Sequence, residues 1–583
     1  MNKTNGGQAV ARMKEKTGEQ AVAETQEITG GQAVAEMLKE YGVTHMFMVP
    51  AILRRAMAEI ERRTKIKVVR THGEKSAVYM ADGYARASGR PGVCGAQVIG
   101  ALNIAAGLRD AWLAHSPVIA FTGGRDPRTK FKKAYQEVDD VPSFEPVTKF
   151  NATIDSVERI PDMLRSAFRI AVSGTPGPVH LQFRGNEGQI DTESAVMEPL
   201  CETLYAKVPP FRPEPELTSI LAALELLQKA KRPLIVAGGG VRWSGAQKEV
   251  VALAEALGIP VATSLNGKGT ITDSHPLSVG VMGTYSRESA NRVVQQADLI
   301  FFVGSEAGGM TTHFWQVPAV GVPTIQVDIN PEVLGRTYPL KVAICGDVKV
   351  TMQRMVEHAD RSTAKRRKSW NETTRSICSE WHKKYQPFLE SNDVPIRPER
   401  ICYELTKGLP DDAIVLVDTG HAGMWMGGMY DTRTNTQSYL RSSGHLGWAF
   451  SAGLGAKCAC PDRPVVVFTG DAGFLYHIAE IETAARRGIN TVTVVNNNHS
   501  GNQSKPGFDR AYEGHQSDWA REMWTFSKVN FARIAEEMGA VGMRVEDPKE
   551  LPGALQRALK ANRPVILDVV TDIEVIAPGA WVK

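Results

Sequence analysis

The chain has 583 residues, 43% of them hydrophobic and 23% charged, an ordinary globular composition that excludes a mainly disordered protein. Its 68 Lys and Arg residues against 64 Asp and Glu residues give a net charge of +4, which excludes a dedicated nucleic-acid binder. No apolar stretch approaches the roughly 18 residues that span a bilayer and no signal-peptide segment is present, so we predict a cytoplasmic protein without a membrane partner.

The first residues contain a short repeat. Variants of Gly-Gly-Gln-Ala-Val-Ala recur with a period of 12 at 6–11, 18–23 and 30–35. Three copies are too few for a solenoid. The third copy runs into a helical pattern with Thr29 as a potential N-cap, so we predict that 1–28 form a mobile extension.

From residue 29 to 195, apolar strand-like runs alternate with helical segments. This rhythm is typical of a parallel sheet that is covered on both faces. We predict strands at 45–49, 67–71, 92–97, 118–122 and 179–183, and helices that include 76–88 and 103–114. A Pro-rich segment at 208–215 predicts a stiff linker.

Two further α/β units follow, at 216–364 and 397–583. Between them lies a polar, helical-looking connector at 365–395, and its basic run Lys365 to Lys368 is expected on a solvated face. The predicted fold class is therefore α/β, with three doubly wound parallel-sheet domains. The predicted strands are 233–237, 260–262, 299–303 and 324–329, then 414–418, 464–469, 491–496 and 564–570.

The third unit carries the strongest chemical signal. Its strand at 464–469 ends in Gly470-Asp471-Ala472-Gly473, a helix is predicted through Arg487, and the next strand ends at Asn498. Because ligands bind at the carboxyl edge of such sheets, Asp471 and Asn498 are expected to lie together there. One carboxylate and one amide oxygen suit Mg²⁺, and glycine backbone suits a phosphate.

These residues resemble a known family. Gly470-Asp471-Ala472, followed by Asn498 27 residues after the Asp, resembles the diphosphate signature of thiamine-diphosphate (ThDP) enzymes, in the acetolactate synthase, pyruvate oxidase and 2-hydroxyacyl-CoA lyase branch. The segment from His72 to Arg86 is similar to the one that carries the family's activating glutamate, which identifies Glu74. The resemblance covers the chain from about Thr29 to near its end.

The resemblance implies a role for each unit. Domain 29–195 would bind the aminopyrimidine, 216–364 would be the central domain, and 397–583 would bind the diphosphate and Mg²⁺. The metal ligands would be Asp471, Asn498 and the carbonyl of Ser500. The remaining implied cofactor contacts are Glu74, Asp418, Gly420, His421, Gly444, Leu446, Gly470, Ala472, Gly473 and Asn498.

The family's chemistry implies how these residues act. Glu74 would bond N1′ of the aminopyrimidine, Gly444 would offer its carbonyl to the 4′-amino group, and Leu446 would bend the cofactor so that C2 of the thiazolium is deprotonated. His445 and His499 adjoin these motifs and are candidates for protonating the enamine or handling the acceptor. Because the two cofactor domains come from different chains in this family, a homodimer or homotetramer is implied.

Several positions depart from acetolactate synthases. The usual Ser-Gly-Pro-Gly-like turn is replaced within 97–103, Thr-Gly-Gln becomes Thr122-Gly123-Gly124, and Gln-His becomes His421-Ala422. These changes cluster where substrate and acceptor would sit. They argue against ordinary branched-chain acetolactate synthesis and leave the cofactor machinery intact.

The central unit has a glycine-rich strand end but no G-x-G-x-x-G, since Trp243 stands in the third glycine's place. By resemblance this domain would hold FAD, hold another nucleotide such as ADP, or be empty.

The predicted function is a ThDP- and Mg²⁺-dependent lyase or carboligase. It would most readily decarboxylate a 2-oxo acid and pass the enamine to a proton or a carbonyl acceptor. The alternatives are chemistry like that of 2-hydroxyacyl-CoA lyase or oxalyl-CoA decarboxylase, with an acyl-CoA or acyloin substrate, and chemistry like that of sulfoacetaldehyde acetyltransferase. Outside the lyases, a flavin-dependent oxidoreductase or a silent ThDP-fold scaffold remains open.

Overall fold

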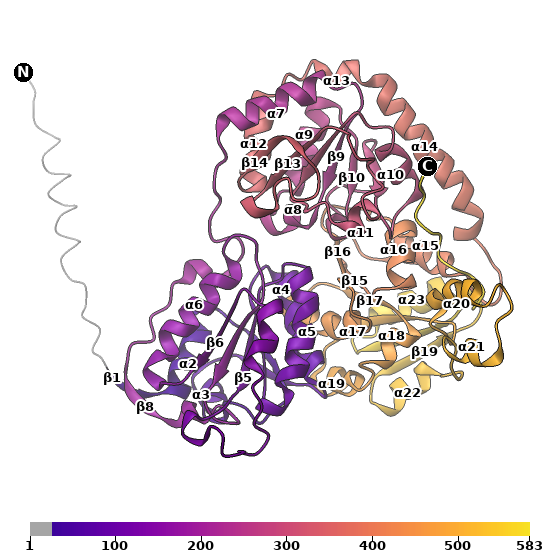
Figure 1. The fold of residues 1–583 in the computed structure, drawn as a ribbon. Coiled ribbons are helices and arrows are strands. Elements are labelled where there is room, and N and C mark those ends of the chain that lie inside the picture. The colour runs from indigo at the N-terminus through magenta and orange to yellow at the C-terminus, as the bar shows by residue number, and fades with distance from the viewer. Residues whose placement is uncertain (1–25) are drawn as a thin grey trace, which may run out of the picture.

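The computed structural model describes residues 26–583 as three α/β domains (Figure 1). Each contains one six-stranded sheet in which all paired strands are parallel. The predicted fold class is therefore confirmed, and every predicted strand lies within one residue of an observed one. Most of the predicted extension, residues 1–25, lies outside the described residues.

The first sheet has the strand order β3-β2-β4-β5-β7-β6. Its strands are β2 (His45–Met48), β3 (Lys67–Arg70), β4 (Gly92–Ala96), β5 (Val118–Gly123), β6 (Phe150–Ile154) and β7 (Val179–Phe183), and its helices are α2 (Gly30–Glu40), α3 (Arg54–Arg63), α4 (Glu74–Ser88), α5 (Ala101–Leu113) and α6 (Ile160–Val172). β1 (Gln26–Thr29) pairs antiparallel with β8 (Ser194–Met197). Thr29 is the N-cap of α2, as predicted, and it forms a capping box with Gln32.

The central sheet has the order β11-β10-β9-β12-β13-β14, and its strand order reverses between β9 and β12. Its strands are β9 (Pro233–Ala237), β10 (Val261–Thr263), β11 (Ser278–Val281), β12 (Leu299–Val303), β13 (Thr324–Asp328) and β14 (Leu340–Cys345), and its helices are α7 (Leu217–Lys229), α8 (Gly239–Ser244), α9 (Gln247–Leu257), α10 (Glu288–Val294), α11 (Gly309–Thr312) and α12 (Val348–His358).

The basic connector forms α13 (Thr363–Arg366) and α14 (Lys368–Leu389), which runs along the outside of the central domain (Figure 1). The prediction that its basic run is solvated is wrong for Arg367, which is 2% exposed. Its guanidinium donates to the carbonyls of Leu227 and Leu257, so this arginine fastens the connector to the helices of the central domain.

The third sheet has the order β16-β15-β17-β18-β20-β19. Its strands are β15 (Ile414–Val417), β16 (Ser438–Arg441), β17 (Val465–Gly470), β18 (Val492–Asn497), β19 (Val541–Val545) and β20 (Val565–Val570), and its helices are α15 (Pro398–Gly408), α16 (His421–Met429), α17 (Trp448–Ala459), α18 (Asp471–Leu475), α19 (Glu480–Arg487), α20 (Lys505–Ala511), α21 (Asp518–Glu522), α22 (Phe531–Glu537) and α23 (Leu551–Lys560). The single helix predicted after Asp471 is wrong, because α18 ends at Leu475 and a turn precedes α19.

The first and third domains are joined by close packing of α4 against α17 (Figure 1). A Cβ on Gly83 would lie 1.9 Å from the carbonyl oxygen of Ala452, and one on Gly455 would lie 1.8 Å from that of Met80. One glycine on each helix therefore permits this approach.

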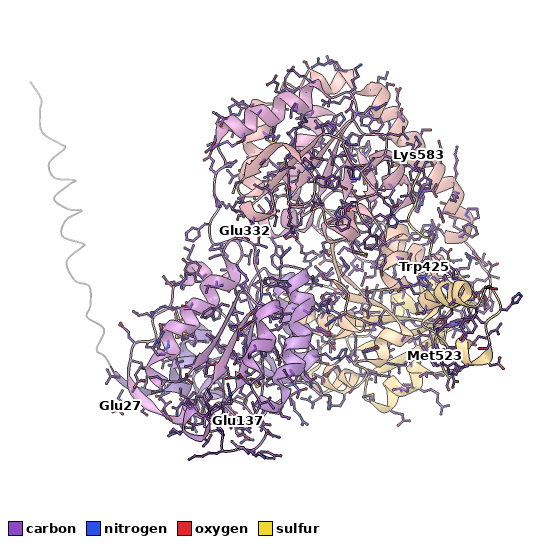
Figure 2. All side chains as sticks on the ribbon, viewed as in Figure 1. Glu27, Glu137, Glu332, Trp425, Met523 and Lys583 are labelled. Atoms are coloured by element: carbon purple, nitrogen blue, oxygen red, sulfur yellow. The ribbon has the colours of Figure 1, made fainter. Side chains whose placement is uncertain are left out.

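The third domain also shares a hydrophobic core with the central one, and that core includes Leu265 and the buried Trp425 (Figure 2). Within residues 26–583, no helix is both long and apolar enough to cross a membrane.

Candidate active site

Two predicted metal ligands, Asp471 and Asn498, meet at the carboxyl edge of the third sheet beside Ser500. The backbone N–H of Ser500 lies 3.3 Å from Asp471 Oδ2 and 3.1 Å from Asn498 Oδ1, so these two oxygens face the same point. The N–H of His499 also donates to Asp471 Oδ2, at 2.6 Å. Gly501 and His499, on either side of Ser500, bond the segment around Thr525, which fixes the Ser500 loop against the strand ends.

Asp471 is a buried carboxylate with backbone donors and no cationic partner within the described residues. Only 1% of its surface is exposed, and burial raises its pKa to about 7 despite the N–H groups of Ala472, His499 and Ser500. A bound cation would stabilise the ionised form of this buried carboxyl group. Within residues 26–583 no three His, Cys, Asp or Glu side chains gather into a metal cluster. A site with one carboxylate and one amide oxygen fits Mg²⁺, which takes few protein ligands.

The prediction places Asp418 against the cofactor, and the structure shows both of its oxygens engaged by protein. Oδ1 accepts from the N–H of Thr419 at 2.8 Å, and Oδ2 accepts from Gly447 N–H at 3.0 Å and Thr469 Oγ1 at 2.9 Å. A Cβ on Gly473 would lie 2.7 Å from this carboxylate. Burial raises the pKa of Asp418 to about 7. Asp418 therefore holds the ends of β15 and β17 and the loop before α17 together.

That loop, residues 442–447, is also held from the first domain by Asp110. The carboxylate of Asp110 accepts from Ser443 N–H at 2.9 Å, His445 N–H at 3.1 Å and the Ser442 hydroxyl at 2.9 Å. Arg86 pairs with Asp110 at 2.9 Å from behind. Two buried carboxylates, one from each domain, thus fix the loop. Sequence reasoning missed Asp110, because a single Asp inside a helix gives no signal.

The loop presents its predicted residues to the outside of the chain. Gly444 has φ +146° with open space where a Cβ would be, and Leu446 is 36% exposed. Gly470 also faces open space. In contrast, a Cβ on Gly420, just before α16, would lie 2.8 Å from Gln503 Oε1. Gly444, Leu446 and Gly470 are therefore accessible in a single chain, whereas Asp418, Gly420, Gly473 and Asn498 are buried.

Comparison with known proteins identifies the family. Models of the thiamine pyrophosphate enzyme match residues 28–143 as the N-terminal TPP binding domain, 220–355 as the central domain and 418–569 as the C-terminal TPP binding domain. The chain belongs to the thiamine pyrophosphate enzymes, in the acetolactate synthase branch.

Three of the similar proteins are named acetolactate synthase large subunits. The probable acetolactate synthase large subunit of Methanococcus aeolicus is 32% identical over 88% of this chain and 87% of its own. Its counterpart from Methanocaldococcus jannaschii is 32% identical over 87% of each chain. The large subunit from Lactococcus lactis is 28% identical over 91% of each chain. The chain is accordingly an enzyme that uses thiamine diphosphate.

In this thiamine pyrophosphate enzyme, Glu74 lies at the start of α4 and faces away from its own third domain. Its carboxylate accepts from Asn103 at 3.1 Å, and a Cβ on Gly100 would lie 2.6 Å from its Cγ. Ser76 and Tyr79, on the other side of α4, contact the third domain instead. These contacts of Glu74 thus lie within the first domain.

The predicted histidines have separate environments. His445 Nδ1 lies 2.6 Å from the Tyr79 hydroxyl, between the first and third domains. His421 Nδ1 lies 2.7 Å from Asn502 Oδ1. His499 adopts φ +59°, and its Nδ1 is buried without a hydrogen-bond partner among the described residues. Burial lowers the pKa of all three, which favours their neutral form.

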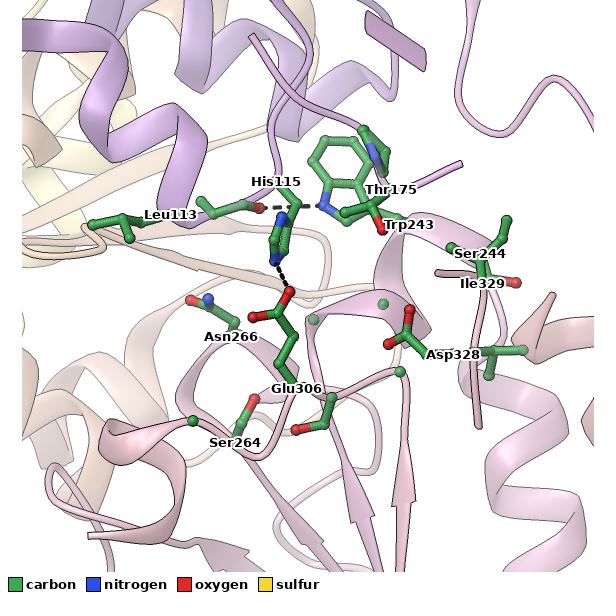
Figure 3. Close-up of a pocket in the computed structure, with 18 of the residues that line it drawn as sticks. Leu113, His115, Thr175, Trp243, Ser244, Ser264, Asn266, Glu306, Asp328 and Ile329 are labelled. Atoms are coloured by element: carbon green, nitrogen blue, oxygen red, sulfur yellow. Dashed lines mark hydrogen bonds and ion pairs between the residues drawn. The ribbon is translucent and has the colours of Figure 1, made fainter. Parts of the chain in front are cut away.

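A cavity of about 330 Å³ opens at the carboxyl edge of the central sheet, where β9 and β12 diverge (Figure 3). It is lined by Gly239 and Gly240 after β9, Glu306 after β12 and Asp328 at the end of β13. Burial raises the pKa of Asp328, and His115 pairs with Glu306 at 3.2 Å. Crevices at such a reversal of strand order are where doubly wound folds bind nucleotides.

Proposed function

We propose that the chain is a Mg²⁺-dependent carboligase of the acetolactate synthase type, which decarboxylates a 2-oxo acid and transfers the remaining acyl unit to a carbonyl acceptor. The observation that carries this is the buried Asp471 carboxylate beside Asn498, at the reversal point between β15 and β17. The similar proteins named acetolactate synthase support the choice of reaction.

Thiamine diphosphate, when bound, supplies the electron sink for cleaving a bond next to a carbonyl. We propose that Asp471, Asn498 and the Ser500 carbonyl hold the Mg²⁺, and that the N–H groups near Gly470 and Ala472 approach the diphosphate. The open faces of Gly444 and Leu446 would orient the cofactor rings, and Glu74 would hold a proton at the aminopyrimidine.

We propose further that the site is completed by a second copy of the chain. Glu74 and Asn103 lie beside an exposed apolar surface on α5 and the turn before it, where Ile99 is 59% exposed and Leu102 is 50% exposed. Near the diphosphate edge, Leu475 and Tyr476 are also exposed. Because isolated chains seldom expose such side chains together, pairing of these surfaces in a homodimer or homotetramer explains them.

For the central cavity we propose a nucleotide. Asp328 lines the cavity at the end of β13, where its carboxylate can accept hydrogen bonds from ribose hydroxyl groups, and the strand ends carry glycines that allow close approach of a ligand. FAD and a plain adenine nucleotide both fit this description. The absorbance spectrum of the protein as purified distinguishes them, since only a flavin absorbs visible light.

The test of the reaction is CO₂ release from a panel of 2-oxo acids that starts with pyruvate. The protein is stripped of metal and then reconstituted with thiamine diphosphate and Mg²⁺. We expect wild-type release, about 10²–10⁴-fold less from Glu74→Gln, and no change from Glu61→Gln on the exposed face of α3. Silence across the panel despite tight cofactor binding would refute decarboxylation, and acyl-CoA or acyloin cleavage would be examined next.

A further inference from the structure

We propose that a second cavity, at the junction of all three domains, binds the phosphate group of a small molecule through Arg242. The cavity measures about 290 Å³. Its walls come from the end of α4, from α8 and residues 266–270 of the central domain, and from residues 435–439 of the third domain. This site is separate from the cofactor site and does not depend on the proposed reaction.

The side chains that line this cavity have one sign of charge. No Asp or Glu among the described residues lines it. Four cationic residues do: Arg86, Arg212, Arg242 and Lys268. Three of the four are neutralised from behind. Arg86 pairs with Asp82, Arg212 with Asp347, and Lys268 with Asp273.

Arg242 is the exception. Its guanidinium donates to the carbonyls of Arg86 at 3.0 Å and Tyr439 at 3.3 Å, and it forms no ion pair with a carboxylate within residues 26–583. Burial and the nearby cations Arg86 and Arg463 lower its pKa to about 10. A half-buried cation beside other cations is unfavourable, and a bound anion would compensate it.

A second guanidinium repeats this pattern next to it. Arg441 donates to Asn266 Oδ1 at 2.9 Å and to the Ser442 carbonyl, and it too has no ion pair within the described chain. Arg441 lines the central cavity, and Asn266 lines both cavities, as Trp243 and Pro209 also do. The two cavities therefore adjoin, with one unpaired arginine in each.

Phosphate fits this site by charge and by geometry. Guanidinium groups bind phosphate oxygens through paired N–H donors, and the cavity adds the amides of Gln247 and Asn435, whereas that of Gln437 bonds Arg433 and Pro410. Two kinds of ligand would present such a phosphate group. One is free phosphate or a phosphate monoester, and the other is a nucleotide whose remainder lies in the central cavity. Because Arg242 already bonds backbone from the first and third domains, the bound anion would tie all three domains together.

The test measures thermal unfolding of the holoenzyme. Saturating thiamine diphosphate and Mg²⁺ fill the cofactor site first, and inorganic phosphate or ADP is then added at constant ionic strength. We expect at least one probe to raise the unfolding midpoint of the wild type. The control variant Lys248→Gln, which removes an exposed charge on α9, should show the same increase, and the midpoint of Arg242→Gln should hardly change. Stabilisation by both probes shows that free phosphate suffices. Stabilisation by ADP alone shows that the phosphate belongs to a nucleotide.

Either of two results overturns the proposal. One is no stabilisation of the wild type by either probe, and the other is an equal shift in wild type and Arg242→Gln. If Arg242→Gln does not fold, calorimetric titration of Arg242→Lys replaces it. The lysine keeps the charge but loses the paired donors, so we expect about tenfold weaker binding of the effective probe, and unchanged affinity would contradict the assignment.

Discussion

The first and third domains have the same strand order, yet their carboxyl edges are chemically different. Numbered within each domain, both sheets run 2-1-3-4-6-5. In the third, the reversal point carries Asp471, buried and without a cation among the described residues. In the first, the matching strand end carries Gln97, whose amide bonds Asn186 and Gln136 at 2.6 and 3.0 Å. The third-domain edge has a carboxylate that lacks a cation, whereas the polar group at the first-domain edge is hydrogen-bonded within the protein. Strand order therefore sets where a site can form, and the side chains at that point set what it can bind.

The largest expected effect comes from the third-domain edge. Asp471→Asn removes the only carboxylate of the proposed metal site, and we expect Mg²⁺ activation to weaken by at least about 100-fold. Gln97→Leu, at the matching point of the first domain, serves as the comparison and should change Mg²⁺ activation far less. Equal losses in the two variants, measured as activity against Mg²⁺ concentration, would break the contrast between the domains.

Asp110 links the two domains and is the next test. Asp110→Asn leaves Arg86 with Asp82 alone and weakens the bonds to Ser443 and His445, so we expect a loss of about 3 kcal/mol in the free energy of unfolding. Because the loop also carries Gly444 and Leu446, the affinity for thiamine diphosphate should fall as well. Unfolding in urea and cofactor titration measure the two effects, and unaltered cofactor affinity would limit Asp110 to a structural role.

The contact between α4 and α17 predicts a smaller effect on stability. The methyl group of Gly83→Ala would strike the Ala452 backbone, so overpacking should cost about 1–3 kcal/mol. Gly89→Ala, where a Cβ meets no atom within 4 Å but φ is +71°, tests backbone strain alone. If Gly83→Ala proves as stable as wild type in urea, the close approach of the two helices is not required.

A pH dependence of the free energy of unfolding also separates the two edges. The pKa of Asp471 is raised by burial to about 7, above its ordinary value of 3.8. Its contribution to the stability of the metal-free protein is therefore full below about pH 4 and is lost as pH rises toward 7. Asp471→Asn should reduce this slope and leave the part that comes from Asp418, whose pKa burial also raises to about 7, whereas Gln97→Leu should not reduce it. A profile unchanged by Asp471→Asn would show that another group dominates.

Most of the strands predicted from the sequence are buried on both faces, and the edge strands β6, β11, β14, β16 and β19 were missed, although the edge strand β3 was predicted. β6 and β19 are half-buried along most of their length and have no continuous apolar run, and β14 alternates exposed with partly or fully buried residues. Asp471 and Asn498 were predictable because each follows a buried strand. Asp110 was not, because its partners at 442–445 lie more than 300 residues away and only packing of α4 on α17 brings them together.

Complementation between two inactive variants tests the central claim most directly. Glu74→Gln and Asp471→Asn chains are co-expressed with different tags, and the hybrid mixture is assayed against each variant alone. If Glu74 of one chain completes the Asp471 site of another, a hybrid dimer keeps one intact site of two, and random pairing restores about a quarter of the wild-type activity. If both residues serve the same site within one chain, no site is intact in any hybrid. Activity that stays at the level of the separate variants would therefore contradict a site shared between chains.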